Sequence, residues 1–463
     1  MKAPSAGMTG SHGSSGALRR QRRRPPVRIV HLGLGAFHRA HLARYTDLVD
    51  DAREWGIAAF TGRSPTAARM LAAQDCLYTL VERSPDGDHR HVVESIVQAH
   101  DGADLHTLRS LVAAPTTAIL SLTVTEAGYL LDAHGLLDIA AVEPDVRTLR
   151  TDPAGEVSTM PGRVISALDA RRRKGSGPIA VVSCDNLAGN GLATRSSVLG
   201  TAALLDDRLA AWIDTEVSFV SGSVDRITPR TTPRDVEELT AATGVLDRSP
   251  IVTEPFSDWV LSGSFPAGRP DWGRAGAAFV DDIDPFERRK LWLLNGSHSL
   301  LAYTGLLRGH RTVADAFDDP GCLRPVEEFW AEAAHHLTDP RLTVPDYLTR
   351  LRERFGNTRI EHRLTQIATD AVAKLPLRVV PVLTAERNVG RTGSASAAVL
   401  AAWDDFLDTV DDPPDAAAEP VRSARRVADP ERTVALLRLI GIGDPAVAAL
   451  VQGLRRGGNP TPT

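Results

Sequence analysis

The sequence predicts an α/β fold: an N-terminal parallel-sheet domain followed by a mostly α-helical C-terminal domain. Two observations predict it. Short apolar runs alternate with helical patterns in the first part of the chain, and patterns of helical period fill most of the chain beyond residue 284. Continuous apolar runs are typical of parallel strands that helices cover on both faces. We expect a disordered tail over residues 1–25, a sheet domain over 26–283 and a helical domain over 284–463.

The individual elements follow from the spacing of apolar residues. We expect strands that begin at Val27 and that span residues 56–60, 118–124 and 179–183. Helices are predicted over residues 161–174, 191–213, 285–308, 322–337, 360–374, 396–409 and 430–455. The Pro- and Asp-rich stretch 411–420 is predicted to be a surface linker.

The first 25 residues are rich in Gly, Ser and Arg and show no apolar periodicity, which predicts a basic, solvated tail. The arginine run at 19–24 is similar to the start of a twin-arginine export signal. Because no apolar segment follows the run, we do not expect export.

Composition and charge exclude several classes of protein. The chain has 463 residues, with 53 Lys and Arg against 58 Asp and Glu, so its net charge of −5 argues against a general nucleic-acid binder. It has no apolar run of about 18 residues, so we expect no membrane partner. Its three cysteines are widely spaced, which excludes a disulfide framework and a CxxC metal site and fits a reducing cytoplasm.

A glycine turn follows the first predicted strand and precedes a helix. Gly33 permits a tight turn, and Gly35 lets the backbone approach a pyrophosphate at the start of the helix, as in a Rossmann-like dinucleotide-binding domain. The third glycine of that motif is absent, because His38 occupies its position. An ordinary tight turn is the alternative.

The end of the second predicted strand bears on the choice between NAD and NADP. NAD-binding folds usually place an acidic residue there for the ribose 2′-hydroxyl. This strand is followed instead by Arg63 and Ser64, which can hold a 2′-phosphate, so both NAD and NADP stay open. After the third strand, Thr125 is a candidate cofactor contact, together with Glu126 and Tyr129.

Lysine is rare in this chain, and one lysine lies in a notable segment. Only four of the 53 basic residues are Lys, and unlike Arg a desolvated Lys can lose its proton. Lys290 belongs to a helical pattern for which Asp284, Pro285 and Glu287 form an N-terminal cap. At about 100° per residue, Lys290, Asn295 and His298 share one broad face.

These residue types can carry hydride-transfer chemistry on an alcohol or carbonyl. A desolvated Lys has a lowered pKa, so Lys290 can accept the hydroxyl proton as hydride leaves carbon. Asn295 and Asn186, the latter in the loop after the fourth strand, can donate hydrogen bonds to the developing alkoxide, and His298 can orient the hydroxyl. The alternative is a surface Lys with two satisfied core polar groups.

Several motifs occur together in a characteristic order, namely GLGAFHRAH (33–41), LTVTEAGY (122–129), SCDN (183–186), VDRITPR (224–230), VTEPFSDWV (252–260), GRPDW (268–272) and KLWLLNGSHSLLAY (290–303). Together they closely resemble the mannitol dehydrogenase family of polyol-specific long-chain dehydrogenases and reductases. The resemblance covers about residues 27–380, and the K-x4-N-x2-H pattern is its most specific part.

The resemblance implies a function and roles for individual residues. It implies an NAD- or NADP-dependent, metal-independent, cytoplasmic and monomeric oxidoreductase acting on a sugar alcohol or aldonate and its ketose or keto-uronate. Lys290 would be the general acid or base, Asn186 and Asn295 the oxyanion site, His298 a positioning group and Asp225 a supporting carboxylate. Glu287 would help to pass the proton to solvent. Gly33, Gly35 and Phe37 would line the cofactor.

The substrate itself stays open at this point. The segment from Arg363 to Lys374 is more similar to uronate reductases, in which Gln tends to replace the Arg of polyol enzymes at the position of Gln366. Arg363 can pair with a sugar carboxylate, and Arg363, Gln366 and Lys374 are therefore the candidate substrate contacts. Mannitol-1-phosphate 5-dehydrogenase activity and a non-catalytic NAD(P)- or sugar-sensing role are the alternatives.

Two other routes to the same chemistry are excluded. Short-chain dehydrogenases need Tyr-x-x-x-Lys, and no tyrosine in this chain has a lysine four residues later. Zinc alcohol dehydrogenases need clustered Cys and His ligands, which His38, His41, His335 and His336 do not supply.

Overall fold

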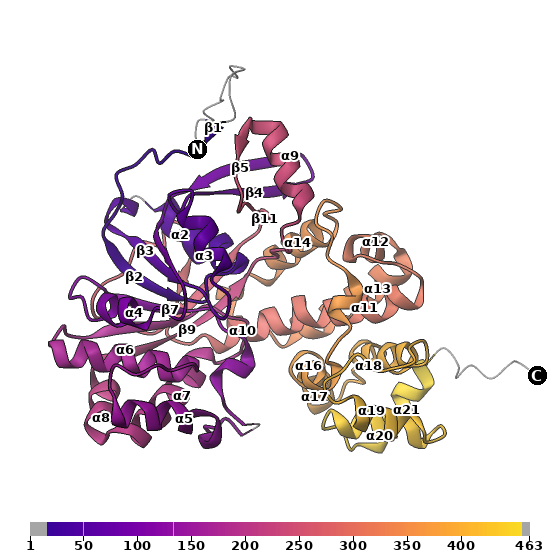
Figure 1. The fold of residues 1–463 in the computed structure, drawn as a ribbon. Coiled ribbons are helices and arrows are strands. Elements are labelled where there is room, and N and C mark those ends of the chain that lie inside the picture. The colour runs from indigo at the N-terminus through magenta and orange to yellow at the C-terminus, as the bar shows by residue number, and fades with distance from the viewer. Residues whose placement is uncertain (1–15, 50, 133, 456–463) are drawn as a thin grey trace, which may run out of the picture. The chain divides into compact units, whose positions relative to one another are not determined.

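A computed structural model describes residues 16–49, 51–132 and 134–455 (Figure 1). The chain divides into two compact units, Met1–Ile283 and Asp284–Thr463. Among the described residues, no helix combines the length and the apolar character needed to cross a membrane.

The first unit is built on an eight-stranded sheet with the order β13-β12-β9-β8-β7-β2-β3-β6. Its strands are β2 (Val27–Leu32), β3 (Gly56–Phe60), β6 (Ile96–His100), β7 (Ile119–Leu122), β8 (Ile179–Ser183), β9 (Val217–Asp225), β12 (Asp258–Ser262) and β13 (Ala278–Phe279). The run from β6 to β9 is parallel, and β12 is antiparallel to β9. This parallel run has the strand order of a dinucleotide-binding fold, so the predicted Rossmann-like sheet is confirmed.

Side chains on the central strands alternate between two apolar cores, one on each face. Ile29 and Ile57 belong to one core cluster, and Val30 and Ala58 belong to the other. The helices of this unit are α1 (Ala36–Ala40), α2 (Leu42–Leu48), α3 (Thr66–Ala72), α4 (Leu105–Val112), α5 (Ile139–Thr151), α6 (Met160–Lys174), α7 (Asn190–Leu205), α8 (Asp207–Glu216) and α9 (Pro233–Thr243). The predicted helix over 191–213 is two helices, because Asp206 adopts an extended conformation and caps α8.

A small second sheet, which the apolar pattern does not predict, has the order β11-β4-β5. Its strands are β4 (Tyr78–Ser84), β5 (Gly87–Val93) and β11 (Ile251–Thr253). The turn Ser84-Pro85-Asp86-Gly87 between β4 and β5 has residues typical of tight turns, so a local indication of the hairpin was available. A two-stranded pair joins β1 (Gly16–Ala17) to β10 (Val245–Leu246).

The segment that precedes β2 packs on the first unit from residue 16 onward. The Arg20 side chain donates to the carbonyl oxygens of Asp75 at 2.9 Å and Ile96 at 3.1 Å, and its Nε donates to the Asp75 carboxylate at 3.1 Å. Arg22 pairs with Asp47. The expected tail over 1–25 therefore differs from the structure over residues 16–25, because its arginines have acidic partners far along the chain. Residues 1–15 lie outside the described residues.

The second unit is mostly helical, as predicted. Its helices are α10 (Asp284–Arg289), α11 (Ser297–Leu307), α12 (Val313–Asp318), α13 (Pro320–His335), α14 (Val344–Phe355), α15 (Leu364–Ile367), α16 (Ala371–Arg378), α17 (Val380–Asn388), α18 (Ser394–Leu407), α19 (Ala418–Arg425), α20 (Glu431–Leu439) and α21 (Pro445–Leu454). A π-helical segment, Lys290–Gly296, joins α10 to α11.

Three long predicted helices are interrupted. The pattern over 360–374 is broken by Asp370, whose φ is +56°, and the pattern over 430–455 is broken at Gly441, whose φ is +84°. The linker predicted over 411–420 ends inside α19, which begins at Ala418. The interruption over 285–308 is the π-helical segment, which belongs to the candidate site described below.

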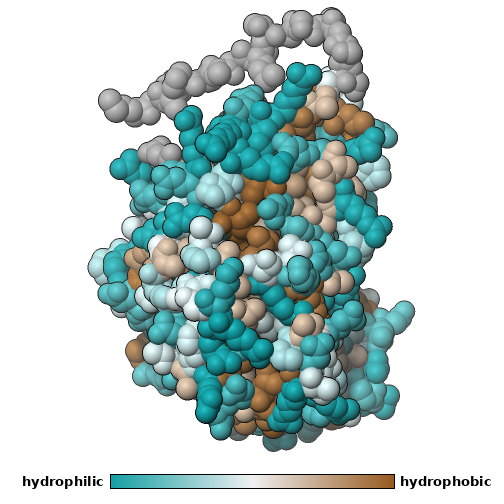
Figure 2. Space-filling view, turned by 60° about the vertical axis from the view of Figure 1, so that its left-hand side comes forward, coloured by the Kyte–Doolittle hydropathy of each residue, from teal (hydrophilic) through white to brown (hydrophobic). Residues whose placement is uncertain are grey.

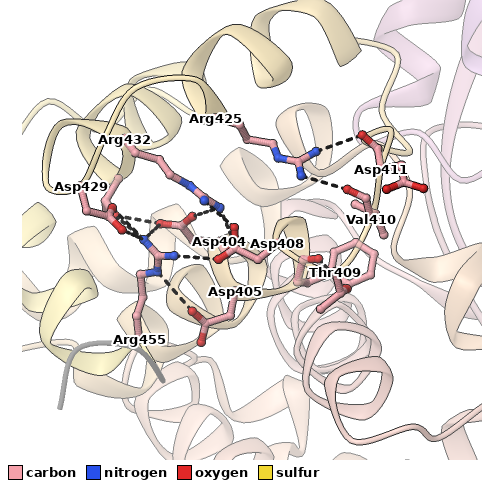
Figure 3. A network of polar contacts seen from close by, with 12 residues as sticks. Asp404, Asp405, Asp408, Thr409, Val410, Asp411, Arg425, Asp429, Arg432 and Arg455 are labelled. Carbon is pink, nitrogen blue, oxygen red and sulfur yellow. Dashed lines mark hydrogen bonds and ion pairs between the residues drawn. The ribbon is translucent and has the colours of Figure 1, made fainter. Parts of the chain in front are cut away.

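A cluster of acidic and basic side chains closes the C-terminal part of the second unit (Figure 3). Arg455 pairs with Asp404 at 3.2 Å, Asp405 at 3.2 Å, Asp408 at 3.0 Å and Asp429 at 2.8 Å. This network connects the end of α18 to the loop before α20 and to the end of α21.

Candidate active site

The glycine turn lies between the ends of two strands in the first unit. Gly33 has φ +111°, and a Cβ at this position would lie 2.1 Å from the carbonyl oxygen of Thr123, just after β7. The amides of Gly33 and Leu34 donate to the carbonyl oxygen of Phe60, at the end of β3, at 2.9 and 2.8 Å. Gly33 is therefore required by close backbone approach at the point where the strand order reverses, which is where such folds bind dinucleotides.

The start of α1 is open to a ligand. Gly35 is its N-cap residue, and no side chain caps the helix. A Cβ on Gly35 would have only the Gly33 carbonyl oxygen near it, at 3.6 Å. The absence of a side chain at Gly35 leaves space beside the first helical amides, so the turn fits a pyrophosphate.

The missing third glycine has a structural counterpart. His38 is buried, and its ring stacks on that of His31 with centroids 3.4 Å apart and an angle of 9° between the planes. His31 in turn contacts the hydroxyl groups of Ser121 at 2.9 Å and Thr123 at 2.8 Å, and burial lowers its pKa to about 3. Two flat rings thus provide the close packing between helix and strand that glycine usually provides.

The other predicted cofactor residues lie near the carboxyl ends of the strands. Arg63 and Ser64 are exposed after β3, and the Ser64 hydroxyl contacts that of Thr66 at 2.9 Å. Thr125 is exposed after β7, whereas Phe37 is half-buried on α1 and stacks on His41 at 5.0 Å. These positions agree with contact to a dinucleotide, and their role stays a prediction.

The loop after β8 contains an acid that sequence reasoning missed. Asn186 is exposed in this loop, and its neighbour Asp185 is buried. The Tyr129 hydroxyl donates to Oδ2 of Asp185, so Tyr129 links the loops after β7 and β8. Burial raises the pKa of Asp185 to about 6. The SCDN motif contains this Asp, but its burial depends on packing.

Asp225 lies at the end of β9, next to a buried arginine. Asp225 is buried, and its partner in the strand register is Asp258 of β12. The buried guanidinium of Arg226 donates to the carbonyl oxygen of Ala40 at 2.7 Å and to Glu82 Oε1 at 2.5 Å. Because Ala40 is the last residue of α1, Arg226 connects the Asp225 strand end to the helix of the glycine turn.

The predicted lysine helix differs from a regular α-helix over Lys290–Gly296, which forms the π-helical segment. A wheel of about 100° per residue does not apply to this segment, because a π-helix bonds residue i to i+5. Lys290 is half-buried at its first position, and Asn295 is buried near its end. Single π-helical turns occur frequently at functional sites.

Close contact explains Gly296. A Cβ on Gly296 would lie 2.5 Å from the Phe329 ring of α13 and 3.2 Å from the carbonyl oxygen of Arg378. The prediction that another backbone approaches this glycine agrees with that geometry. Any larger side chain at this position would push α13 and α16 away from the segment.

His298, on α11, is buried among rings and basic groups. Its ring lies 4.8 Å from that of Phe355 and 5.0 Å from that of His362. Burial lowers its pKa well below the usual value, and His362, Arg354 and Arg378 lower it further. Its buried Nε2 has no hydrogen-bond partner within the described part of the chain. A neutral imidazole with a buried nitrogen that lacks a protein partner is suited to a ligand.

Two of the three predicted substrate residues lie on helices that pack on α11 or on the π-helical segment. Gln366 is exposed on α15, which packs on α11, and Lys374 lies on α16, which packs on the π-helical segment. Lys374 Nζ donates to the Thr369 carbonyl oxygen at 2.7 Å, and burial followed by the charge of Arg378 lowers its pKa. Arg363 is exposed and pairs with Glu361 at 2.8 Å, and its contact with a substrate carboxylate stays a prediction.

One group of side chains in the described residues has the composition of a metal site. Ligand atoms of His310, Asp319 and Cys322 lie within 4.8 Å of one another. The Arg308 guanidinium binds both oxygens of the Asp319 carboxylate, with Nε 2.5 Å from Oδ2 and Nη2 3.1 Å from Oδ1. The positive charge of this guanidinium disfavours a metal cation at the same carboxylate. We therefore interpret the group as part of an ion pair and not as a metal site.

Comparison with known proteins places most of the chain in one family. Residues 27–274 match the mannitol dehydrogenase Rossmann domain, and residues 282–440 match the mannitol dehydrogenase C-terminal domain. D-mannonate oxidoreductase of Escherichia coli (strain K12) is 39% identical over 403 residues, which are 83% of this chain and 81% of that protein. Mannitol 2-dehydrogenase of Cereibacter sphaeroides is 38% identical over 386 residues, covering 81% and 80%.

Solved structures agree with these relatives. The ternary complex of Pseudomonas fluorescens mannitol 2-dehydrogenase with NAD and D-mannitol has a TM-score of 0.79 and 34% identity, and covers 94% of this chain and 93% of that one. D-sorbitol dehydrogenase in substrate-free form has a TM-score of 0.83 and 30% identity, covering 94% of both chains. The resemblance stated from the motifs is thus confirmed, and this chain belongs to the mannitol dehydrogenase family.

Proposed function

We propose that this protein is an NAD(P)-dependent oxidoreductase that interconverts a sugar alcohol or aldonate and its ketose or keto-uronate. The observation that carries the proposal is the segment from Lys290 to His298, in which a lysine precedes a buried Asn295 and a buried, neutral His298. It occurs in a chain that belongs to a family of such oxidoreductases.

Each of the proposed site residues would have a role that follows from its chemistry. Lys290 accepts the hydroxyl proton in oxidation and returns it in reduction. The Asn295 amide donates to the oxygen while it carries negative charge, and His298 Nε2 holds the hydroxyl in place. Asn186 and Asp225 are proposed as a further donor and a supporting carboxylate, respectively. When bound, NAD or NADP supplies the hydride acceptor of the oxidation, and the Gly33–Gly35 turn would hold its pyrophosphate.

The finer substrate class that we propose is a sugar acid. After burial, the groups that lower the pKa of His298 are His362, Arg354 and Arg378, all of which are basic, and Lys374 lies one helical turn before Arg378. Basic groups of this kind can pair with a substrate carboxylate, which a neutral hexitol lacks. The similarity to D-mannonate oxidoreductase supports the same choice.

A reductase assay that follows absorbance at 340 nm tests the proposal. D-Fructuronate and D-tagaturonate are compared with D-fructose, each with NADH and with NADPH. We expect kcat/KM to be highest for a keto-uronate. A higher value for fructose would overturn the sugar-acid proposal alone, and activity on fructose 6-phosphate alone would instead favour mannitol-1-phosphate 5-dehydrogenase activity. Cofactor binding without turnover of any sugar would favour the sensing role.

A further inference from the structure

The π-helical segment Lys290–Gly296 is held by side chains from two other helices. The indole Nε1 of Trp330, on α13, donates to the Leu293 carbonyl oxygen at 2.9 Å. Nη1 of Arg378, on α16, lies 3.5 Å from the carbonyl oxygen of Asn295 and donates to Ser299 Oγ at 3.1 Å. The Ser299 hydroxyl itself donates to the Asn295 carbonyl at 3.2 Å. Arg378 and Ser299 therefore act together on Asn295.

A second contact places Arg378 against the same turn. The carbonyl oxygen of Arg378 would lie 3.2 Å from a Cβ on Gly296, so the backbones of α16 and of the segment are in close approach. The Arg378 side chain is half-buried, and its charge contributes to the lowered pKa of both His298 and Lys374. One side chain thus contacts or influences Asn295, His298 and Lys374.

We propose that Arg378 is a positioning residue for the proposed reaction, holding Asn295 and the adjacent His298 in place through the Asn295 carbonyl and the Ser299 hydroxyl. The inference rests on the proposed function, because the geometry that it protects is that of the proposed oxygen-binding groups. A single guanidinium nitrogen, Nη1, faces both the Ser299 hydroxyl and the Asn295 carbonyl, and a shorter lysine ammonium would not occupy the same position. A shift of about 1 Å in a positioned group can cost a hundredfold in rate.

Steady-state kinetics of Arg378→Met, Arg378→Lys and Ser299→Ala test this role, with Arg387→Met as a matched control. Arg387 is on α17 and pairs with Asp444 at 3.4 Å. We expect Arg378→Met to lower kcat by about tenfold to a hundredfold, with the sugar KM and the cofactor Kd changed by less than about threefold. Arg378→Lys should recover only part of kcat, and Arg387→Met should match the wild type.

Ser299→Ala provides a second test of the proposal in case Arg378→Met does not fold. It removes the hydroxyl that joins Arg378 to the Asn295 carbonyl, so we expect a smaller loss of kcat, and little further loss when it is combined with Arg378→Met. Unchanged kcat in both single variants, a loss confined to KM, or additive losses would overturn the proposal. If Arg378→Met does not fold, the result for Ser299→Ala decides.

Hydrogen exchange separates this inference from the proposed function. Amides of residues 290–303 should exchange faster in Arg378→Met and in Ser299→Ala than in the wild type, while those of α1 stay unchanged. If the wild type turns over no sugar, the proposed function fails, and the exchange comparison still decides whether Arg378 orders the segment. Equal exchange in all three proteins would overturn that role.

Discussion

Lys290 is one of four lysines in a chain that carries its other positive charges on arginine, and the proposed proton transfer depends on it. Its amine is the proposed proton acceptor. Replacing Lys290 by Met removes this amine and keeps an unbranched side chain that favours a helix. At the scale of the residue, the chemistry and the choice of cofactor can each be tested with one substitution.

Lys290→Met should abolish most turnover without loss of cofactor binding. We expect kcat to fall by about 10²–10⁴-fold, because general acid or base catalysis contributes that much. The glycine turn belongs to the first unit, so the Kd for NAD(P)H, measured by fluorescence titration, should not change. Lys174→Met, at the exposed end of α6, is the control and should keep full activity. A Lys290→Met enzyme of normal kcat would refute the assignment.

Arg63 tests the cofactor preference. Its exposed guanidinium after β3 can pair with a 2′-phosphate. We expect Arg63→Ala to lower kcat/KM for NADPH by about tenfold to a hundredfold, since a hydrogen bond to a charged group is worth about 1.5–3 kcal/mol, and to leave the value for NADH within about twofold. An equal loss with both cofactors would show that Arg63 does not discriminate between them.

At the scale of the element, the π-helical segment and the loop after β8 concentrate the unusual features of the molecule. The segment has a glycine against which Phe329 of α13 and the Arg378 carbonyl of α16 pack closely, and the loop has a buried carboxyl group linked to Tyr129. Gly296 and Asp185 each lie in a short motif of the sequence, but their environment is formed by residues from other elements.

Gly296→Ala should destabilise the second unit. The new methyl group would overlap the Phe329 ring, and overpacking of this kind typically costs about 1–3 kcal/mol. The matched control is Gly453→Ala in α21, where a Cβ would have nothing within 4 Å and where Ala should stabilise the helix by about 0.5–1 kcal/mol. Urea unfolding measures both. Equal changes in the two variants would contradict the close contact at Gly296.

Asp185 should make stability depend on pH. Its folded pKa is raised to about 6 from 3.8, so the carboxyl contributes stability below pH 3.8 that is lost as the pH rises through about 6. Relative to Asp185→Asn, the wild type should therefore become less stable by about 2 kcal/mol between pH 4 and 7. Denaturant unfolding at several pH values measures this difference. A difference that does not vary with pH would contradict the raised pKa.

At the scale of the whole molecule, polar side chains join segments that lie far apart in the sequence. Hydrophilic residues cover most of the face shown in Figure 2, and hydrophobic residues come through between them. Below such surfaces, Arg20, Arg226 and Arg455 each connect several segments. The preference for Arg over Lys suits this role, since one guanidinium can serve several acceptors.

Arg455→Ala tests this role at the end of the chain (Figure 3). Arg455 is largely buried and pairs with Asp404, which is 2% exposed. We expect a loss of about 2–4 kcal/mol in the second unit, because a buried carboxylate would lose one of its two basic partners. Arg324→Ala, which breaks the exposed pair with Glu328, should cost less than about 1 kcal/mol. Thermal unfolding of both variants decides, and similar losses would argue against a buried network.

Patterns within a few neighbouring residues were enough to predict the central strands, the glycine turn and the helical character of the second unit. The strand predicted over 56–60 coincides with β3, because its burial on both faces makes every residue apolar. Strand β12, the edge strand β13 and the hairpin of β4 and β5 were missed, since β13 has only two residues, β12 has only three buried apolar ones, and β4 and β5 mix apolar with polar, partly exposed residues. Candidate residues such as Lys290 and His298 were found from side-chain chemistry, and their roles stay predictions.

Other properties depended on the folded chain, because they need groups that are distant in sequence. The stack of His38 on His31, the pairing of Tyr129 with Asp185 and the contacts of Arg378 with the π-helical segment all arise this way. A helical period of 3.6 residues does not reveal a π-helical turn, whose stability comes from Trp330, Arg378 and the fit of Gly296 against Phe329. Local chemistry thus specified which groups are available, and long-range packing set their environment and geometry.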